Sequence, residues 1–197
     1  MERLKKEMEN RVVRKRRLLR AANFEVVKTF ERYNFDNIQI PPSITVKDIT
    51  NARFLARKEN LILYGAIDTS KSDLATAIGV KARNQGKKVY FFKTAALVNQ
   101  LINAKAQGEL QEFLKRLEKA DLLICDEWGY TPLEKEGAQL LFQVISDCYE
   151  KRSVIIITNL EFSRWNSIFY DEKMTAITTE RLIHHSHLLV FTGFNYR

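Results

Sequence analysis

The amino-acid sequence predicts an α/β fold in which an open, five-stranded parallel sheet carries helices on both faces. Two observations support this prediction. From residue 60 onward, short apolar runs alternate with segments of helical periodicity. In addition, two of the apolar runs lead into polar residues, as strands do at the ligand-binding edge of a parallel sheet.

The expected strands and helices follow one another in a regular order. Short apolar runs predict strands over residues 61–64, 88–92, 121–127, 154–158 and 187–192. Helical periodicity predicts helices over 72–85, 94–117, 134–150, 162–169 and 174–184, with an interruption of the second near Gly108. Thr94 is expected to cap that second helix. This alternation is typical of a doubly wound sheet.

The N-terminal segment has a different character. Residues 1–22 place apolar side chains at helical spacing, which predicts a basic amphipathic helix. The first 32 residues hold 11 Lys+Arg against 5 Asp+Glu, so +6 of the net charge of +8 lies there. A solvated helix face is one interpretation, and a membrane surface is disfavoured because the apolar stripe lacks aromatic anchors. We favour contact with a nucleic-acid backbone through Arg11, Arg14, Lys15, Arg16, Arg17 and Arg20.

Residues 30–50 separate this segment from the sheet. They contain Phe30, Tyr33 and Phe35, which we expect to pack on the following domain, and then Pro41 and Pro42, which exclude a helix. A short helix is expected over residues 49–58. The predicted organisation is therefore a basic helical segment and linker over residues 1–40, followed by an α/β domain over residues 41–197.

Composition narrows the class of protein. With 45% hydrophobic and 28% charged residues, the chain is typical of a globular protein. Its apolar runs are much shorter than the ~20 residues that a membrane-spanning helix needs. The N-terminus lacks the apolar region of a secretion signal, and the two cysteines suggest no disulfide framework. We therefore expect a cytoplasmic protein without a membrane partner.

The first strand leads into a partial phosphate-binding loop. Gly65, Lys71 and Ser72 match the pattern of a glycine, four residues, a second glycine, a lysine and a hydroxyl residue, whereas Ser70 replaces the second glycine. We expect Gly65 and Thr69, Ser70, Lys71 and Ser72 to bind the phosphates of a nucleotide, with the Ser72 hydroxyl on Mg²⁺. Asp68 opposes this binding because its carboxylate would lie near the phosphates.

Two further strands end in groups that suit phosphate chemistry. The third strand ends in Asp126 and Glu127, of which one can coordinate Mg²⁺ and the other can orient a water for attack on a phosphate. The fourth ends next to Asn159, which can bind a phosphate or the attacking water, or can be a helix cap or turn residue. The shared edge of the sheet favours the functional interpretation for all three residues.

The segments that carry these residues resemble the IstB family. The resemblance is carried by residues 60–65, 97–101, 121–130, 132–133, 136–138, 141–146, 149–153, 158–160, 181–187 and 193–197. It implies a P-loop NTPase fold of AAA+ type, related to the DnaC and DnaI helicase loaders. It also implies an ATP-dependent helper of an insertion-sequence transposase, which oligomerises on double-stranded DNA in the presence of ATP and Mg²⁺.

The same resemblance implies residue roles. Lys71 and Ser72 correspond to the Walker A pair and Asp126 and Glu127 to the Walker B pair, with Asp126 on Mg²⁺. Asn159 corresponds to the sensor residue, and Arg181 to an arginine finger that acts on the nucleotide of a neighbouring subunit. The sequence departs from the family loop at Ala66, Ile67, Asp68 and Ser70.

These departures leave alternatives open. One is a DNA-binding scaffold that has lost ATP hydrolysis, and another is a loader whose partner is a replicative helicase in place of a transposase. A small-molecule kinase is disfavoured because the sequence lacks an arginine-rich acceptor lid.

Overall fold

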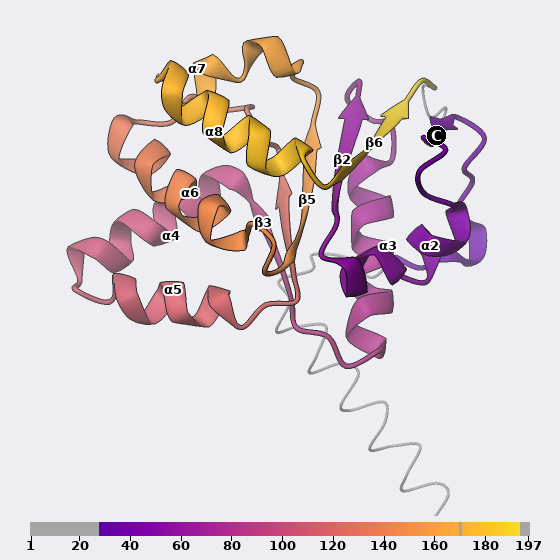
Figure 1. Cartoon of the computed structure of the whole chain (residues 1–197), viewed down its shortest axis with the longest axis horizontal. Coiled ribbons are helices and arrows are strands. Elements are labelled where there is room, and N and C mark those ends of the chain that lie inside the picture. Colours follow the sequence, from indigo (N-terminus) through magenta and orange to yellow (C-terminus); the bar gives the residue numbers. More distant parts are fainter. Residues whose placement is uncertain (1–27, 170, 194–197) are drawn as a thin grey trace, which may run out of the picture.

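The computed structural model describes residues 28–169 and 171–193, and within them it contains a sheet of six strands in the order β1-β6-β2-β5-β4-β3 (Figure 1). The strands are β1 (Ile38–Gln39), β2 (Asn60–Gly65), β3 (Val89–Lys93), β4 (Leu122–Asp126), β5 (Ser153–Thr158) and β6 (Ser186–Phe191). Strands β2 to β6 are mutually parallel, which confirms the five predicted strands. The predicted basic helix, with Arg11, Arg14, Lys15, Arg16, Arg17 and Arg20, lies outside the described residues.

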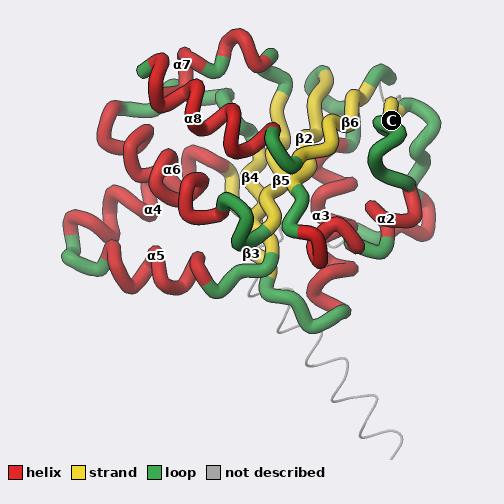
Figure 2. The backbone as a smooth tube through the Cα atoms, in the orientation of Figure 1, coloured by secondary structure: helices red, strands yellow, loops and turns green. Residues whose placement is uncertain are grey.

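Helices cover both faces of the sheet, as predicted (Figure 2). One face carries α2 (Val46–Thr50) and α3 (Lys71–Asn84), and the other carries α4 (Thr94–Ala106), α5 (Leu110–Glu118), α6 (Lys135–Cys148), α7 (Asn166–Phe169) and α8 (Glu172–Ile183). Short 3₁₀ turns are η1 (Phe30–Arg32), η2 (Arg53–Arg57) and η3 (Phe162–Arg164). Alternate residues of β4 point to opposite cores, with Leu123 in one and Leu122 in the other. This two-sided burial explains why the strands are apolar throughout.

The expected sheet lacked one strand. β1 has two residues and pairs antiparallel with β6, with Ile38 opposite Phe191. Two residues carry no periodicity, so this strand cannot be recognised in the sequence. The aromatic residues before it do pack on the domain, as expected, since Phe30, Tyr33 and Phe35 lie against the core on the α3 face.

Some helix boundaries also differ from the expectation. In place of one helix over residues 49–58 there are α2 and η2, separated by Ala52 in the left-handed conformation (φ 52°). α2 begins earlier because Thr45 and Asp48 form a capping box. Thr94 is not the cap of α4: Lys93 holds that position, and the Thr94 hydroxyl donates to the Asp126 carbonyl oxygen at 2.7 Å.

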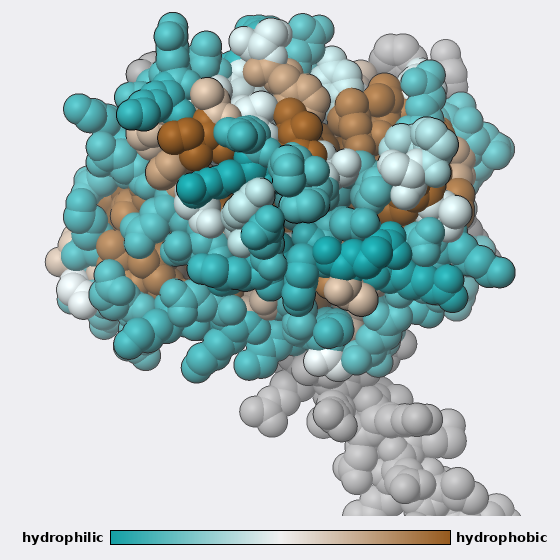
Figure 3. All heavy atoms as spheres, viewed as in Figure 1, coloured by the Kyte–Doolittle hydropathy of each residue, from teal (hydrophilic) through white to brown (hydrophobic). Residues whose placement is uncertain are grey.

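The surface is consistent with a chain that keeps its apolar groups inside. The face in Figure 3 is mostly hydrophilic, with separate apolar patches in its upper part and at its left side. Within residues 28–169 and 171–193, no helix has the length and apolar character needed to cross a bilayer. The two cysteines, Cys125 and Cys148, are buried in the core and unbonded.

Candidate functional site

A cavity of about 830 Å³ opens at the carboxyl ends of β2, β4 and β5. Its walls are the loop between β2 and α3 with the first turn of α3, the residues that follow β4, and the end of β5. The structure thus brings together Thr69 to Ser72, Asp126, Glu127 and Asn159, all of which the sequence placed at one edge of the sheet. Gly65 lies just behind the loop, at the end of β2.

Two residues of the loop have a backbone conformation that favours glycine, although neither of them is a glycine. Asp68 has φ 61° and Ser70 has φ 58°, both in the left-handed region. A non-glycine residue pays roughly 1–2 kcal/mol for that conformation, less for Asp than for Ser. Gly65 is required for a different reason, because a Cβ there would lie 2.6 Å from the carbonyl oxygen of Phe191. The replacement of glycine by Ser70 therefore changes the energy of the loop more than its path.

Lys71 is buried and turned into the loop. Its ammonium donates to the Gly65 carbonyl oxygen at 2.9 Å, to Thr69 Oγ1 at 2.9 Å and to the Ala66 carbonyl oxygen. Burial lowers the pKa of Lys71, while the negative charge of Asp126 opposes that shift. The lysine therefore bonds to oxygens of its own loop. A phosphate that binds Lys71 would have to replace these oxygens as the acceptors of its hydrogen bonds.

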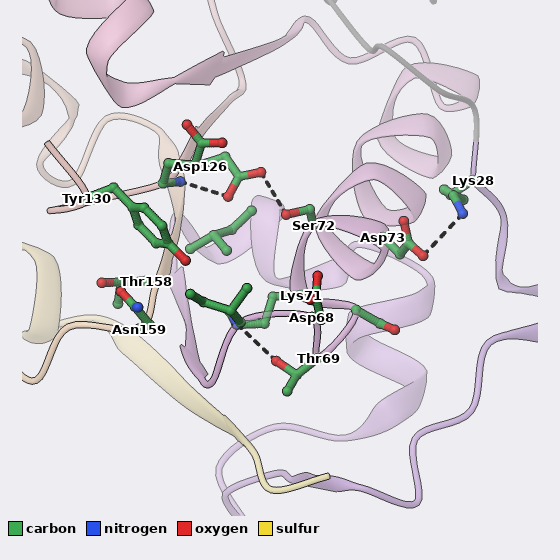
Figure 4. Close-up of a pocket in the computed structure, with 14 residues that line it drawn as sticks. Lys28, Asp68, Thr69, Lys71, Ser72, Asp73, Asp126, Tyr130, Thr158 and Asn159 are labelled. Atoms are coloured by element: carbon green, nitrogen blue, oxygen red, sulfur yellow. Dashed lines mark hydrogen bonds and ion pairs between the residues drawn. The ribbon is translucent and has the colours of Figure 1, made fainter. Parts of the chain in front are cut away.

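The Ser72 hydroxyl and the Asp126 carboxylate are in contact at the wall of the cavity (Figure 4). Ser72 Oγ donates to Asp126 Oδ2 at 2.7 Å, and the Glu127 backbone N–H donates to Asp126 Oδ1 at 2.7 Å. Burial raises the pKa of Asp126, and its hydrogen bond from Ser72 opposes that rise. A hydroxyl beside a carboxylate is the donor set that Mg²⁺ prefers, so these two residues fit the predicted ion.

Glu127 and Asn159 lie on neighbouring strand ends that are tied together. The Trp128 backbone N–H donates to the Ile157 carbonyl oxygen at 2.9 Å, and Thr158 Oγ1 donates to the Trp128 carbonyl oxygen at 2.8 Å. Glu127 has φ 56°, and its carboxylate forms an ion pair of 3.0 Å with Lys93. The bonds between the two strand ends hold Glu127 and Asn159 at one wall of the cavity.

Arg181 lies away from this cavity. It belongs to α8, which leads into the first residue of β6, and Ser186 there pairs with Asn60 at the start of β2. The cavity opens at the other end of β2, and the Arg181 guanidinium carbon instead lies 6.0 Å from the Tyr149 ring centre. Within one chain, Arg181 does not contribute to the site.

Several residues of the cavity wall were not anticipated from the sequence, among them Lys28, Asp73 and Tyr130. Lys28 and Asp73 form an ion pair of 3.2 Å at the cavity wall, and Tyr130, which is 47% exposed, extends its ring over the cavity in Figure 4. The signal that would have found Tyr130 is its place four residues after Asp126, the last residue of β4, whereas nothing local marks Lys28.

Comparison with known proteins gives a consistent family. The model of the family "IstB-like ATP binding protein" matches residues 2–197. The chain is 36% identical over 173 residues to a protein named as the ATP-binding protein of insertion sequence IS232 from Bacillus thuringiensis subsp. berliner, covering 86% of this chain and 68% of that protein. It is 36% identical over 182 residues to the ATP-binding protein of IS21 from Pseudomonas aeruginosa, covering 91% and 68%.

Solved structures give the fold. The crystal structure of the DnaC helicase loader matches with a TM-score of 0.64 at 20% identity, covering 89% of this chain and 98% of that chain. AMPPCP-bound DnaA from Aquifex aeolicus matches with a TM-score of 0.60 at 17% identity, covering 73% of this chain and 44% of that chain. The fold is therefore the α/β P-loop NTPase fold of AAA+ type, as the sequence predicted.

Proposed function

We propose, because this chain belongs to the family of IstB-like ATP-binding proteins, that it is an ATP-dependent DNA-binding helper of a transposase. Its relatives are named as ATP-binding proteins of insertion sequences, elements that move by means of a transposase. DNA would be held in part by Arg11, Arg14, Lys15, Arg16, Arg17 and Arg20, which stay a prediction from charge alone.

The observation that carries this proposal is the contact of 2.7 Å between Ser72 Oγ and Asp126 Oδ2 at the mouth of the phosphate-binding loop. In the proposed complex these two oxygens would hold Mg²⁺, which when bound shields the charge of the terminal phosphates. Lys71 would transfer its hydrogen bonds from Gly65, Ala66 and Thr69 to the phosphates. The backbone N–H groups at the start of α3 would complete the phosphate site.

Hydrolysis would then depend on Glu127 and Asn159 at the cavity wall. Glu127 would accept the proton of the attacking water after leaving its ion pair with Lys93, and Asn159 would position that water. Arg181 lies too far from its own cavity to help, so we assign it to the nucleotide of a neighbouring copy. Assembly into an oligomer is thus part of the proposal.

A second candidate is a DNA-binding scaffold without ATP hydrolysis. The specific observation in its favour is that the ammonium of Lys71 is already hydrogen-bonded inside a loop in which Asp68 and Ser70 adopt a backbone conformation that favours glycine. Such a loop gains less from a nucleotide than one with an unengaged lysine.

The deciding experiment is a calorimetric titration of the purified chain with ATP and Mg²⁺, followed by light scattering and DNA binding with and without nucleotide. The proposal expects saturable ATP binding, a larger particle, and tighter DNA binding when ATP is present. Absence of ATP binding at millimolar nucleotide would refute the first proposal and favour the DNA-binding scaffold. In that case the double change Asp68→Gly and Ser70→Gly should create binding that the unaltered chain lacks.

A further inference from the structure

Lys28 is a charged residue of the cavity to which neither the sequence nor the phosphate-loop pattern assigns a role. It is the first described residue of the chain, yet it lines the cavity together with the loop that follows β2. Its ammonium lies 3.2 Å from Asp73 Oδ2, on the first turn of α3. Figure 4 shows this pair on the far side of Ser72 from Asp126.

The cavity has an unfavourable charge for a nucleotide. Among the described residues that line it, the carboxylates are Asp68, Asp73, Asp126 and Glu127, and the ammonium groups are Lys28 and Lys71. Lys71 is already engaged by the loop. The negative charge of a bound polyphosphate therefore needs a further positive charge beside it. Lys28 supplies the second ammonium group that lines the described part of the cavity.

The ion pair of Lys28 is of a kind that exchanges easily. The side chains of Lys28 and Asp73 are 44% and 43% exposed, and ion pairs this accessible to water contribute little to stability. A phosphate is a stronger partner for an ammonium, because its oxygens carry more charge and accept several hydrogen bonds. The pair can therefore open in favour of a bound nucleotide.

The position of the pair along α3 indicates which phosphate it meets. Ser72 and Asp126 suit the metal ion and hence the terminal phosphates, whereas Asp73, the next residue of α3, lies with Lys28 on the other side of Ser72. That side is left for the phosphate that is attached to the ribose. ADP and ATP have this phosphate in common.

We propose that Lys28 is a nucleotide-binding residue that leaves Asp73 for the ribose-proximal phosphate of ADP or ATP. This inference rests on the proposed nucleotide site and adds to it a cation from the segment before the sheet. It also explains how the chain can tolerate Asp68 in the loop, since Lys28 supplies compensating charge.

The test is calorimetric titration of the full chain with MgADP and with MgATP for three variants: Lys28→Met, Asp73→Asn and the control Lys105→Met. Lys105 is a matched control because its side chain is similarly exposed, 51% against 44% for Lys28, and pairs with Glu136 at 2.6 Å, away from the cavity. Lys28→Met should weaken both nucleotides by a similar factor, roughly fivefold for a contact of about 1 kcal/mol. Asp73→Asn should tighten both, because it frees Lys28 and removes a negative charge, and Lys105→Met should change neither.

The outcomes separate this inference from the proposed function. If the unaltered chain binds neither nucleotide, both are wrong. If it binds them and Lys28→Met has no effect, or weakens ATP alone, only the inference is overturned. A decrease in affinity for both Lys28→Met and Asp73→Asn would instead assign the pair a purely structural role, and that result also overturns it.

Discussion

The strongest quantitative expectation concerns Ser70, where a residue with a side chain adopts φ 58°. Replacing it by glycine removes a conformational penalty of roughly 1–2 kcal/mol. The greater freedom of glycine in the unfolded chain offsets about 0.4–1 kcal/mol of that gain. The net gain in the free energy of unfolding should be about 1 kcal/mol, which raises Tm by roughly 2–4 °C for a chain of this size.

Thermal denaturation followed by circular dichroism measures this change, with Lys58→Gly as the matched control. Lys58 also has a left-handed backbone (φ 57°), but it precedes the start of β2, at the other end of the strand from the loop. Both variants should raise Tm, and only Ser70→Gly should also tighten ATP, because a glycine lets the backbone approach the phosphates. If Ser70→Gly lowers Tm while Lys58→Gly raises it, the argument from loop strain is wrong.

Three other changes test the packing and the charges of the site. Gly65→Ala should lower the free energy of unfolding by about 2 kcal/mol, and Tm with it, since the added Cβ would lie 2.6 Å from the Phe191 carbonyl oxygen. Burial raises the pKa of Asp126, so the ionised carboxylate destabilises the folded state once the pH rises above that pKa. Asp126→Asn should therefore raise Tm at neutral pH and leave it unchanged in acid, where the carboxyl group is protonated. The same change should weaken Mg²⁺-dependent ATP binding in titrations. Glu127→Gln should keep ATP binding and assembly but slow phosphate release by roughly 10²–10⁴-fold, and an unchanged rate would exclude Glu127 as the base.

Most of the parallel sheet could be recognised from the sequence because each strand carries its own signal. The apolar runs that end at Asp126 and Thr158 are buried on both faces, and such runs can be recognised as strands from their own residues alone. Their parallel order also placed Asp126, Glu127 and Asn159 at one edge before any contact was known. The phosphate-binding loop was found in the same way, from the spacing of Gly65, Lys71 and Ser72.

The features of the fold that the sequence did not predict are those without a local sequence pattern. β1 exists because Ile38 and Gln39 find partners on β6, close to the other end of the chain, and two residues have no periodicity of their own. Thr94 has the side chain of a cap, yet a bond to the Asp126 carbonyl oxygen takes its hydroxyl. In both cases a contact distant in sequence outweighed the local preference.

The sequence by itself determined the parallel strands, the helices between them and the phosphate-binding loop, since apolar periodicity and strand-end polarity are properties of short segments. Only the tertiary structure decided the state of the site: Lys71 bonded within its own loop, Glu127 paired with Lys93, and Lys28 against Asp73. Except for the loop contacts of Lys71, these pairs join segments that meet only when the sheet is assembled. Charge partners depend on distance in space, and no local pattern encodes that distance.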